Sequence, residues 1–273
     1  MNFLYHPQPT TNNQQPTMKQ SFTALALAAI VLLGACGKQD DEGSAPAELV
    51  LQFTSSYAGQ PLLMFERAYS YEEDMAFKVQ LLQFYISDVR LLRQRNGSAE
   101  EVPVLDVASI NFGAVYNDED AAKGISTAPV PIEPGQYTGL KLGFGVSPQL
   151  NATIPPDYAL GHPLAENYWE DANSYIFYRL EGNADLNGDG NFPDKLTFHV
   201  GGDNNYNELE FQGNFSVDKN GRLSIPLDID LRRLLVAPDG EFLDFRQVRQ
   251  AHSVLSPAAI FLSGNAPQAL RLK

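Results

Sequence analysis

Residues 211–229 have the sequence Phe211-Gln-Gly-Asn-Phe-Ser-Val-Asp-Lys-Asn-Gly-Arg-Leu-Ser-Ile-Pro-Leu-Asp-Ile229. The central Asp218-Lys-Asn-Gly221 supplies residues that tolerate positive φ, and such residues favour a tight turn. Branched apolar side chains then recur at every second position, at Leu223, Ile225, Leu227 and Ile229. A period of two places them on one face of a strand. The stretch therefore predicts a β-hairpin whose second strand has one buried and one solvated face.

Most other periodic segments are also short, strand-like and bounded by Gly, Pro, Asn or Asp. The predicted strands are Leu49–Thr54, Phe77–Leu82, Val89–Gln94, Tyr137–Val146, Tyr175–Glu181, Lys195–Val200 and Leu209–Val217. Helical patterns are confined to Asp230–Leu235 and Phe245–Leu255, and a last strand is expected at Ala259–Leu262 or at Ala269–Leu272. The sequence thus predicts a mainly β protein, an antiparallel β-sandwich forming a single domain with a few short helices.

The start of the chain resembles an export signal. After the polar residues 1–17, which suggest a mis-assigned upstream segment, Met18-Lys19 and an apolar run to Leu33 form the signal expected over 18–35. The run is short for a membrane span. Leu33-Gly-Ala-Cys36 resembles a lipobox, so we expect cleavage before Cys36 and acylation of its thiol. The alternative is an ordinary signal peptide followed by an incidental cysteine.

Residues 36–47 are polar and acidic without periodicity, as expected for a flexible tether, and the folded domain is expected over 48–273. Cys36 is the only cysteine, so once it is acylated no thiol remains for a disulfide. We therefore expect a lipoprotein of the cell envelope. Gly37 is not an inner-membrane retention aspartate, which favours the outer membrane, facing the periplasm or the exterior.

The charge balance is acidic. The chain carries 19 basic and 33 acidic residues, and the loss of residues 1–35 removes one lysine and no acid, which leaves a net charge of −15. Such a charge argues against nucleic-acid binding and against electrostatic attraction to anionic lipid. It favours solubility or cationic partners.

A calcium loop is suggested by oxygen-bearing side chains at alternate positions. They are Asp185, Asn187, Asp189 and Asn191, with Gly190 between the last two. Ca²⁺ prefers six to eight oxygen ligands, and glycine permits the sharp turn that such a loop needs. Leu196 occupies the position of the usual bidentate Glu, so Asp194 or Glu181 would complete the set. The alternative is a solvated turn that needs no ion.

Transition-metal binding would depend on the histidines, which after residue 36 are His162, His199 and His252. Leu196, Phe198 and Val200 share one face of their predicted strand, which places His199 on the opposite face. His162 lies in a loop and His252 in a helical pattern, and neither has a partner at ligand spacing.

Three segments of the chain carry a recognisable series of motifs. The first is Leu81-Leu-Gln-Phe-Tyr-Ile-Ser-Asp-Val-Arg-Leu91, and the second is Ile132-Glu-Pro-Gly-Gln-Tyr-Thr-Gly-Leu-Lys-Leu-Gly-Phe-Gly-Val146. The third combines Tyr168-Trp169, Tyr175-Ile-Phe-Tyr-Arg-Leu-Glu-Gly182 and Phe198-His-Val-Gly201. Together the three segments resemble the MbnP-like family of bacterial envelope proteins, some of which bind copper. The resemblance covers roughly residues 48–215 in content and in order.

The resemblance implies a copper site. In the copper-binding members a tryptophan is oxidised to kynurenine by a dihaem peroxidase of the MauG type and joins histidines around the metal. Here Trp169 corresponds to the oxidised residue and His199 to a ligand, whereas Asp171 stands where the best-known site has a histidine. Because a carboxylate is a harder ligand than imidazole, the alternative is a binding or structural module that has kept the fold and lost the copper.

No enzymatic motif accompanies these features. The sequence has no Gly-x-Ser-x-Gly elbow, no His-Glu-x-x-His and no phosphate-binding glycine loop. Acidic runs such as Glu72-Glu-Asp74 are typical of solvated loops. We therefore expect a non-enzymatic protein.

Overall fold

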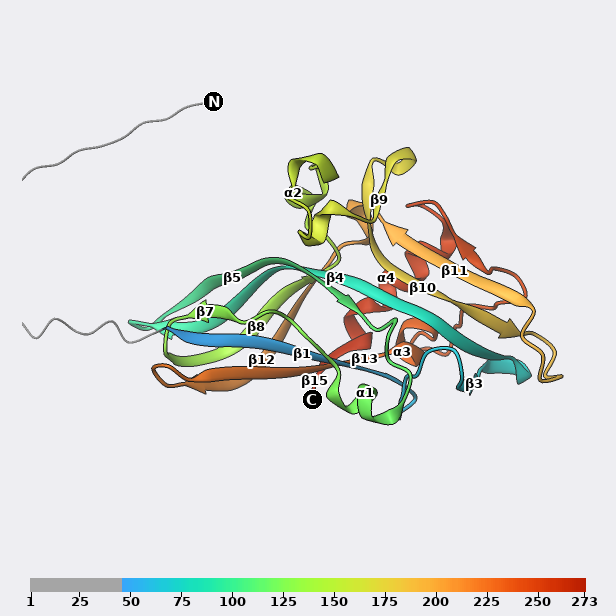
Figure 1. The fold of residues 1–273 in the computed structure, drawn as a ribbon, viewed down its shortest axis with the longest axis horizontal. Coiled ribbons are helices and arrows are strands. Elements are labelled where there is room, and N and C mark those ends of the chain that lie inside the picture. Colours follow the sequence, from blue (N-terminus) through green and yellow to red (C-terminus); the bar gives the residue numbers. More distant parts are fainter. Residues whose placement is uncertain (1–45) are drawn as a thin grey trace, which may run out of the picture. The chain divides into compact units, whose positions relative to one another are not determined.

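The computed structural model describes residues 46–273. The signal-like segment, Cys36 and all but the end of the tether lie outside the described residues. In the described part, strands dominate and belong to a six-stranded and a nine-stranded sheet (Figure 1). No helix in residues 46–273 is both long and apolar enough to span a bilayer.

The six-stranded sheet has the order β15-β13-β1-β2, with β6 and β7 also paired to β1. Its strands are β1 (Ala47–Tyr57), β2 (Gln60–Pro61), β6 (Ile125–Ser126), β7 (Val130–Ile132), β13 (Arg222–Asp230) and β15 (Leu270–Leu272).

The nine-stranded sheet has the order β12-β8-β4-β10-β11-β14, with β3 and β5 paired to β4 and β9 paired to β10. Its strands are β3 (Ala68–Ser70), β4 (Ala76–Arg95), β5 (Ser98–Asn111), β8 (Gly135–Phe144), β9 (Tyr168–Trp169), β10 (Ser174–Asp185), β11 (Asp194–Gly201), β12 (Asn207–Val217) and β14 (Gln250–Ala251). The α-helices are α1 (Asp118–Lys123), α2 (Pro148–Asn151), α3 (Leu231–Leu235) and α4 (Pro257–Ala269).

Aromatic side chains hold the two sheets face to face. Phe53 of β1 packs edge-on against Phe84 of β4, with ring centroids 5.7 Å apart. Tyr57 of β1 meets Phe77 of β4 in the same way at 5.1 Å. All four side chains are buried, and such edge-to-face pairs add to the stabilisation that comes from burial alone. The predicted β-sandwich is therefore confirmed, as an open sandwich of two sheets in one domain.

The predicted hairpin at residues 211–229 is wrong, although both of its strands exist. β12 pairs with β8 in the nine-stranded sheet, whereas β13 pairs with β1, in parallel, in the six-stranded sheet. The turn is present, and Asn220 has a φ of 59°. Turn residues permit a reversal but do not fix the hydrogen-bond partner, so here the chain crosses from one sheet to the other.

The two predicted strands Phe77–Leu82 and Val89–Gln94 are parts of the single strand β4. Asp88 has a φ of 50°, and the pairing register shifts between Val89 and Arg90, which marks a bulge. The bulge interrupts the apolar alternation in the sequence but not the strand. β5 follows as a hairpin partner that the sequence analysis did not anticipate.

Near the C-terminal end the expectations are met in part. Helix α3 agrees with the predicted Asp230–Leu235, and the Asp230 side chain caps it by accepting from the Arg232 N–H. The helix expected at Phe245–Leu255 is wrong, because that segment is loop with the short β14. Helix α4 covers Ala259–Leu262, and the last strand, β15, matches the second alternative.

Candidate functional site

A hollow of about 380 Å³ opens on the outer face of the nine-stranded sheet. Its lining residues come from three separate parts of the chain and are Trp169, Asp171, Ile176, His199 and His252. All three residues predicted at a copper site, Trp169, Asp171 and His199, therefore line one hollow. No spacing of residues in the sequence places His252 with them.

A tight reversal between β9 and β10 positions Trp169 and Asp171. Trp169 is paired with Ser174 across this reversal, and Asp171 lies between them in a short 3₁₀ turn. Asn173 closes the turn in the left-handed conformation with a φ of 48°, and its side-chain oxygen accepts from the Tyr168 hydroxyl at 2.7 Å. Trp169 is partly buried and Asp171 is exposed at the rim of the hollow.

The alternation of β11 positions His199. Leu196, Phe198 and Val200 are buried in the core, and His199 points to the other face, as predicted. Opposite it on β10 lies Arg179, and two residues farther along the same face lies Glu181. Glu181 Oε1 is 2.8 Å from His199 Nε2 and 2.6 Å from Arg179 Nη2.

This contact decides which nitrogen of His199 is available. Burial raises the pKa of Glu181, but the hydrogen bonds from His199 and Arg179 outweigh it and hold the pKa below its ordinary value. Glu181 is therefore an ionised acceptor, and His199 Nε2 must carry the proton. Burial lowers the pKa of His199, opposed by Glu181 and reinforced by Arg179 and His252. The ring is thus neutral near pH 7, with the lone pair on Nδ1.

The short parallel pairing of β14 with β11 brings His252 to the site. Phe198 is in register with Ala251, and the residue that follows each of them in the chain is a histidine, His199 in β11 and His252 directly after β14. The ring centroids of His199 and His252 are 5.2 Å apart. Asn205, which is 1% exposed, donates to the carbonyls of Gly201 and Val254 at 2.7 Å each and ties the segment of His252 to the end of β11.

The arrangement offers two imidazoles to one small ligand. Within residues 46–273 the His252 side chain forms no hydrogen bond, so neither of its nitrogens is engaged. The described part of the chain holds no group of three or more His, Cys, Asp and Glu side chains close enough to hold a metal ion together. The site is therefore a pair of nitrogen donors with an aromatic ring and a carboxylate at its edge.

The model of one protein family, MbnP, matches residues 46–254. The chain belongs to the MbnP family. The matched region includes all five residues that line the hollow. The curated proteins and the solved structures gave no match to this chain.

His162, the remaining histidine of the MbnP domain, has a different environment. Its ring stacks on Tyr158 with centroids 4.2 Å apart, and its Nδ1 accepts from the Leu164 N–H at 3.1 Å. It lines neither the hollow nor the Asp185 loop. His162 therefore contributes nothing to the hollow, whereas His252 lines it beside His199.

The predicted calcium loop lies at the far end of β10, where the MbnP domain turns from β10 into β11. Asp185 is 2% exposed. One of its oxygens accepts from the N–H groups of Asn187, Gly188 and Asp189 at 2.8 to 3.3 Å, and the other accepts from Gly190 at 2.8 Å. Burial opposes ionisation, but these four bonds outweigh it and lower the pKa of Asp185.

The other predicted calcium ligands are arranged loosely around this carboxylate. Asp189 accepts from the backbone N–H of Asn191. The side-chain amide nitrogen of Asn187 donates to both Asp185 and Asp189. Asp194 faces Arg249 at 3.8 Å, and Glu181 turns to His199. The loop is thus organised by its own hydrogen bonds, and calcium binding stays a prediction.

Glu181 and Arg179 were not predicted at the histidine site. A usable signal was present, because both alternate with the buried residues of β10 and therefore share a face. What the sequence lacked was the pairing of β10 with β11 that sets this face beside His199.

Proposed function

We propose that this MbnP domain binds a copper ion in the hollow, with His199 and His252 as its nitrogen ligands. The observation that supports this most is the pair of imidazoles at 5.2 Å, each with an unengaged nitrogen. Imidazole is a favoured ligand of copper, and among the divalent first-row transition metals Cu²⁺ binds a given set of ligands with the highest affinity. The pKa of His199, which burial lowers, also favours metal binding, because protons then compete little for the ring at neutral pH.

The rest of the lining fits a copper ion as well. Asp171 provides a carboxylate oxygen at the rim, and Glu181 acts as an outer partner that fixes the tautomer of His199. An outer carboxylate of this kind orients a ligating imidazole and raises its basicity. Bound copper would supply electron transfer or storage chemistry, and the chain's own residues supply the donor atoms and the shape of the hollow.

We also propose Trp169 as a site of oxidative modification. An indole ring can only donate a hydrogen bond through its N–H, so unmodified Trp169 offers no nitrogen lone pair to a metal. Oxidation to kynurenine would add donor groups at the edge of the hollow. A dihaem peroxidase of the MauG type is the proposed partner, because the resemblance noted in the sequence implies one.

For its location, we propose export and acylation of Cys36, so that a lipid anchor holds the domain at the cell envelope. Metabolic labelling with palmitate should mark the wild-type chain and leave a Cys36→Ser variant unlabelled. Equal labelling of both chains would contradict the anchor.

The copper proposal can be tested by native mass spectrometry of the mature chain purified from its own envelope. Copper, as Cu(I) and in parallel as Cu(II), is titrated into the wild type and into His199→Ala, His252→Ala and His162→Ala variants. We expect one copper per chain in the wild type and the His162 variant and a loss in the other two. Peptide mapping of the same sample should show a mass shift at Trp169.

If the wild type binds neither Cu(I) nor Cu(II), the alternative hypothesis remains, which is a binding or structural MbnP domain without copper. A copper retained by both His199→Ala and His252→Ala would place the metal elsewhere in the chain. Either result would contradict the proposed ligands.

A further inference from the structure

A groove of about 490 Å³ adjoins the hollow that His199 and His252 line. Its lining residues are Ile154, Pro155, Pro156, Tyr168 and Glu170. Strand β9 and the turn after it contribute to both sites, because Tyr168 and Glu170 line the groove whereas Trp169 and Asp171 line the hollow. Consecutive residues of a strand point to opposite sides. A molecule seated in the groove would therefore lie beside Trp169.

The apolar side chains around this groove are uncovered. Ile154 is 44% exposed, and Leu160, from the same loop, is 99% exposed. Pro156 is exposed as well. A single exposed apolar residue is common on protein surfaces, but apolar residues gathered at a concave site are typical of a binding surface. The groove therefore has the apolar lining of a docking site.

The loop that carries the groove is held in shape by its own contacts. The ring of Tyr158 stacks on His162 with centroids 4.2 Å apart, and the hydroxyls of Tyr158 and Thr153 are hydrogen-bonded at 2.9 Å. His162 Nδ1 accepts from the N–H of Leu164, whose side chain is fully buried. A surface that is already ordered loses little conformational entropy on binding. His162, which contributes nothing to the hollow, thus supports the shape of this loop.

The charges of this surface are all of one sign. Between residues 142 and 178 the sequence contains no lysine and no arginine. The acidic residues of this stretch are Asp157, Glu166, Glu170 and Asp171. All four are exposed, and none of them forms an ion pair within residues 46–273. Uncompensated carboxylates attract a cationic partner and repel an acidic one.

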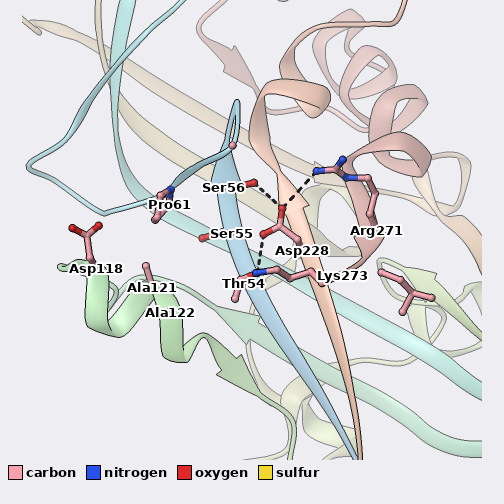
Figure 2. A pocket seen from close by; sticks show the side chains of 12 residues that line it. Thr54, Ser55, Ser56, Pro61, Asp118, Ala121, Ala122, Asp228, Arg271 and Lys273 are labelled. Carbon is pink, nitrogen blue, oxygen red and sulfur yellow. Dashed lines mark hydrogen bonds and ion pairs between the residues drawn. The ribbon is translucent and has the colours of Figure 1, made fainter. Parts of the chain in front are cut away.

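The larger hollow on the six-stranded sheet, of about 630 Å³, provides a contrast (Figure 2). There Asp228 accepts from the hydroxyls of Thr54 and Ser56 at 2.7 Å each, and Arg271 Nη2 is 3.8 Å from the same carboxylate. Lys273 lines this hollow as well. Charges of opposite sign compensate one another in this hollow, whereas those around the groove do not. Charge complementarity therefore favours the groove as the place where a charged partner docks.

We propose that the groove docks a protein whose contact face is rich in lysine or arginine and carries an exposed apolar side chain. The apolar side chain would fill the groove between Pro155 and Tyr168, and the cationic groups would face Asp157 and Glu170. The role of this partner rests on the function proposed above, because docking here would place it beside Trp169, the proposed site of oxidation. The docking itself needs neither copper nor a modified tryptophan, so the unmodified chain suffices to measure it.

An NMR titration of the copper-free mature chain with reduced cytochrome c tests the proposal. This haem protein has a lysine-rich face, and the same protein with acetylated lysines is the matched probe, because acetylation removes the charge. At about 50 mM salt, where screening is weak, we expect saturable binding of the unmodified probe alone, with the largest amide shifts within residues 152–171. No binding, or shifts centred elsewhere, would overturn the proposal.

Two charge reversals separate docking from attraction by the net charge. Glu119 of α1 is the control for Glu170, because it is also exposed and forms no ion pair within the described part of the chain. In Figure 1 α1 lies at the bottom of the view and β9 at the top. We expect Glu170→Lys to weaken cytochrome c binding by at least about 5-fold and Glu119→Lys by less than about 2-fold. Equal losses would contradict the groove, since both variants change the net charge equally.

Ile154→Ser tests the apolar part of the site. Ile260 of α4 is the control, because it is the same residue type with a similar exposure, 54% against 44%, and does not line the groove. We expect Ile154→Ser to weaken cytochrome c binding by about 3-fold, as for the loss of a partly buried apolar contact, and Ile260→Ser to leave it unchanged. Wild-type affinity in Ile154→Ser would show that the groove is not occupied.

The docking and the metal site can fail independently. His199→Ala should lose copper and keep cytochrome c binding, whereas Glu170→Lys should keep copper and lose cytochrome c binding. A wild type that binds cytochrome c in the groove but no copper would contradict the metal site alone. A wild type that binds copper but no cytochrome c would contradict the docking alone.

Discussion

The two ends of β10 carry the two candidate metal sites, and they differ in how their donor atoms are used. Near the start of the strand, His199 and His252 each keep a nitrogen that no neighbour engages. At its end, the buried Asp185 carboxylate accepts four backbone N–H groups of its own loop. The histidine site thus has nitrogen atoms free to bind a metal, whereas the carboxylate oxygens of the Asp185 loop are already used in hydrogen bonds.

This difference shows what residue spacing alone leaves open. Oxygen-bearing residues at alternate positions suit a Ca²⁺ loop, but the same residues suit a turn that satisfies its own backbone. The histidines have no ligand-like spacing in the sequence, yet strand pairing brings them together. Whether a donor is available is decided by its neighbours in the fold. The following changes test that contrast, from the largest expected effect to the smallest.

Replacement of His199 should have the largest effect on copper. We expect His199→Ala to weaken copper binding by more than about 100-fold, since even outer partners of a metal ligand are worth about 10- to 100-fold. Competition with a chromophoric copper chelator measures the affinity. His162→Ala is the matched control, because its ring is stacked on Tyr158 away from the hollow. A similar loss in both variants would indicate damage to the fold.

Glu181 sharpens the comparison, because it is a carboxylate that acts on a ligand instead of binding the metal. Glu181→Ala should weaken copper binding by about 10-fold, because nothing then holds the proton on His199 Nε2. Glu181→Gln retains an acceptor oxygen and should lose less. NMR of the ring nitrogens of His199 reports the tautomer directly. A tautomer unchanged in Glu181→Ala would refute the positioning role.

The Asp185 loop should respond through stability. Asp185→Asn leaves one acceptor oxygen for four N–H groups, so we expect the melting temperature to fall by several degrees. Asp239→Asn is the control, since that exposed side chain accepts a single N–H, from Glu241. An equal fall of the melting temperature in both variants would show that the Asp185 carboxylate does not organise the loop.

The pH dependence of the same variant follows from the lowered pKa of Asp185. The native state binds this proton less readily than the unfolded state, so the stabilisation is complete above the unfolded value of about 4 and is lost as the pH falls through the native pKa. In the Asp185→Asn variant, the free energy of unfolding should lose this part of its decrease at acid pH. Urea unfolding followed across that range measures it, and identical acid limbs would contradict the assignment.

Calcium should have the smallest effect. Because the oxygens of Asp185 are already engaged, we expect millimolar Ca²⁺ to raise the melting temperature only slightly, and Asp185→Asn to abolish the rise. A large increase in the wild type would mean that the loop rearranges around the ion. That outcome would remove the contrast between the two ends of β10.

The sequence predicted the class of the fold and the positions of most strands because alternation reports local burial. β11 is the clearest case, since its pattern also predicted the outward orientation of His199. Pairing is not local. The turn at 218–221 gave no sign that β12 and β13 enter different sheets, and the bulge at Val89 concealed the length of β4.

The candidate site was predictable to the same extent. Trp169, Asp171 and His199 were named through the resemblance to the MbnP family, and they line one hollow. His252 was assigned to a helix, because residues 245–255 have a helical spacing of apolar side chains. In the fold this segment instead follows β11 and is anchored by Asn205, a contact that no periodicity encodes.

The most direct test is an anomalous difference map at the copper absorption edge, from crystals of the mature chain grown with one equivalent of copper. We predict a single strong peak between His199 and His252, with His199 Nδ1 as one ligand and Glu181 still on Nε2. A peak at the Asp185 loop, or none in the hollow at full copper loading, would contradict the account.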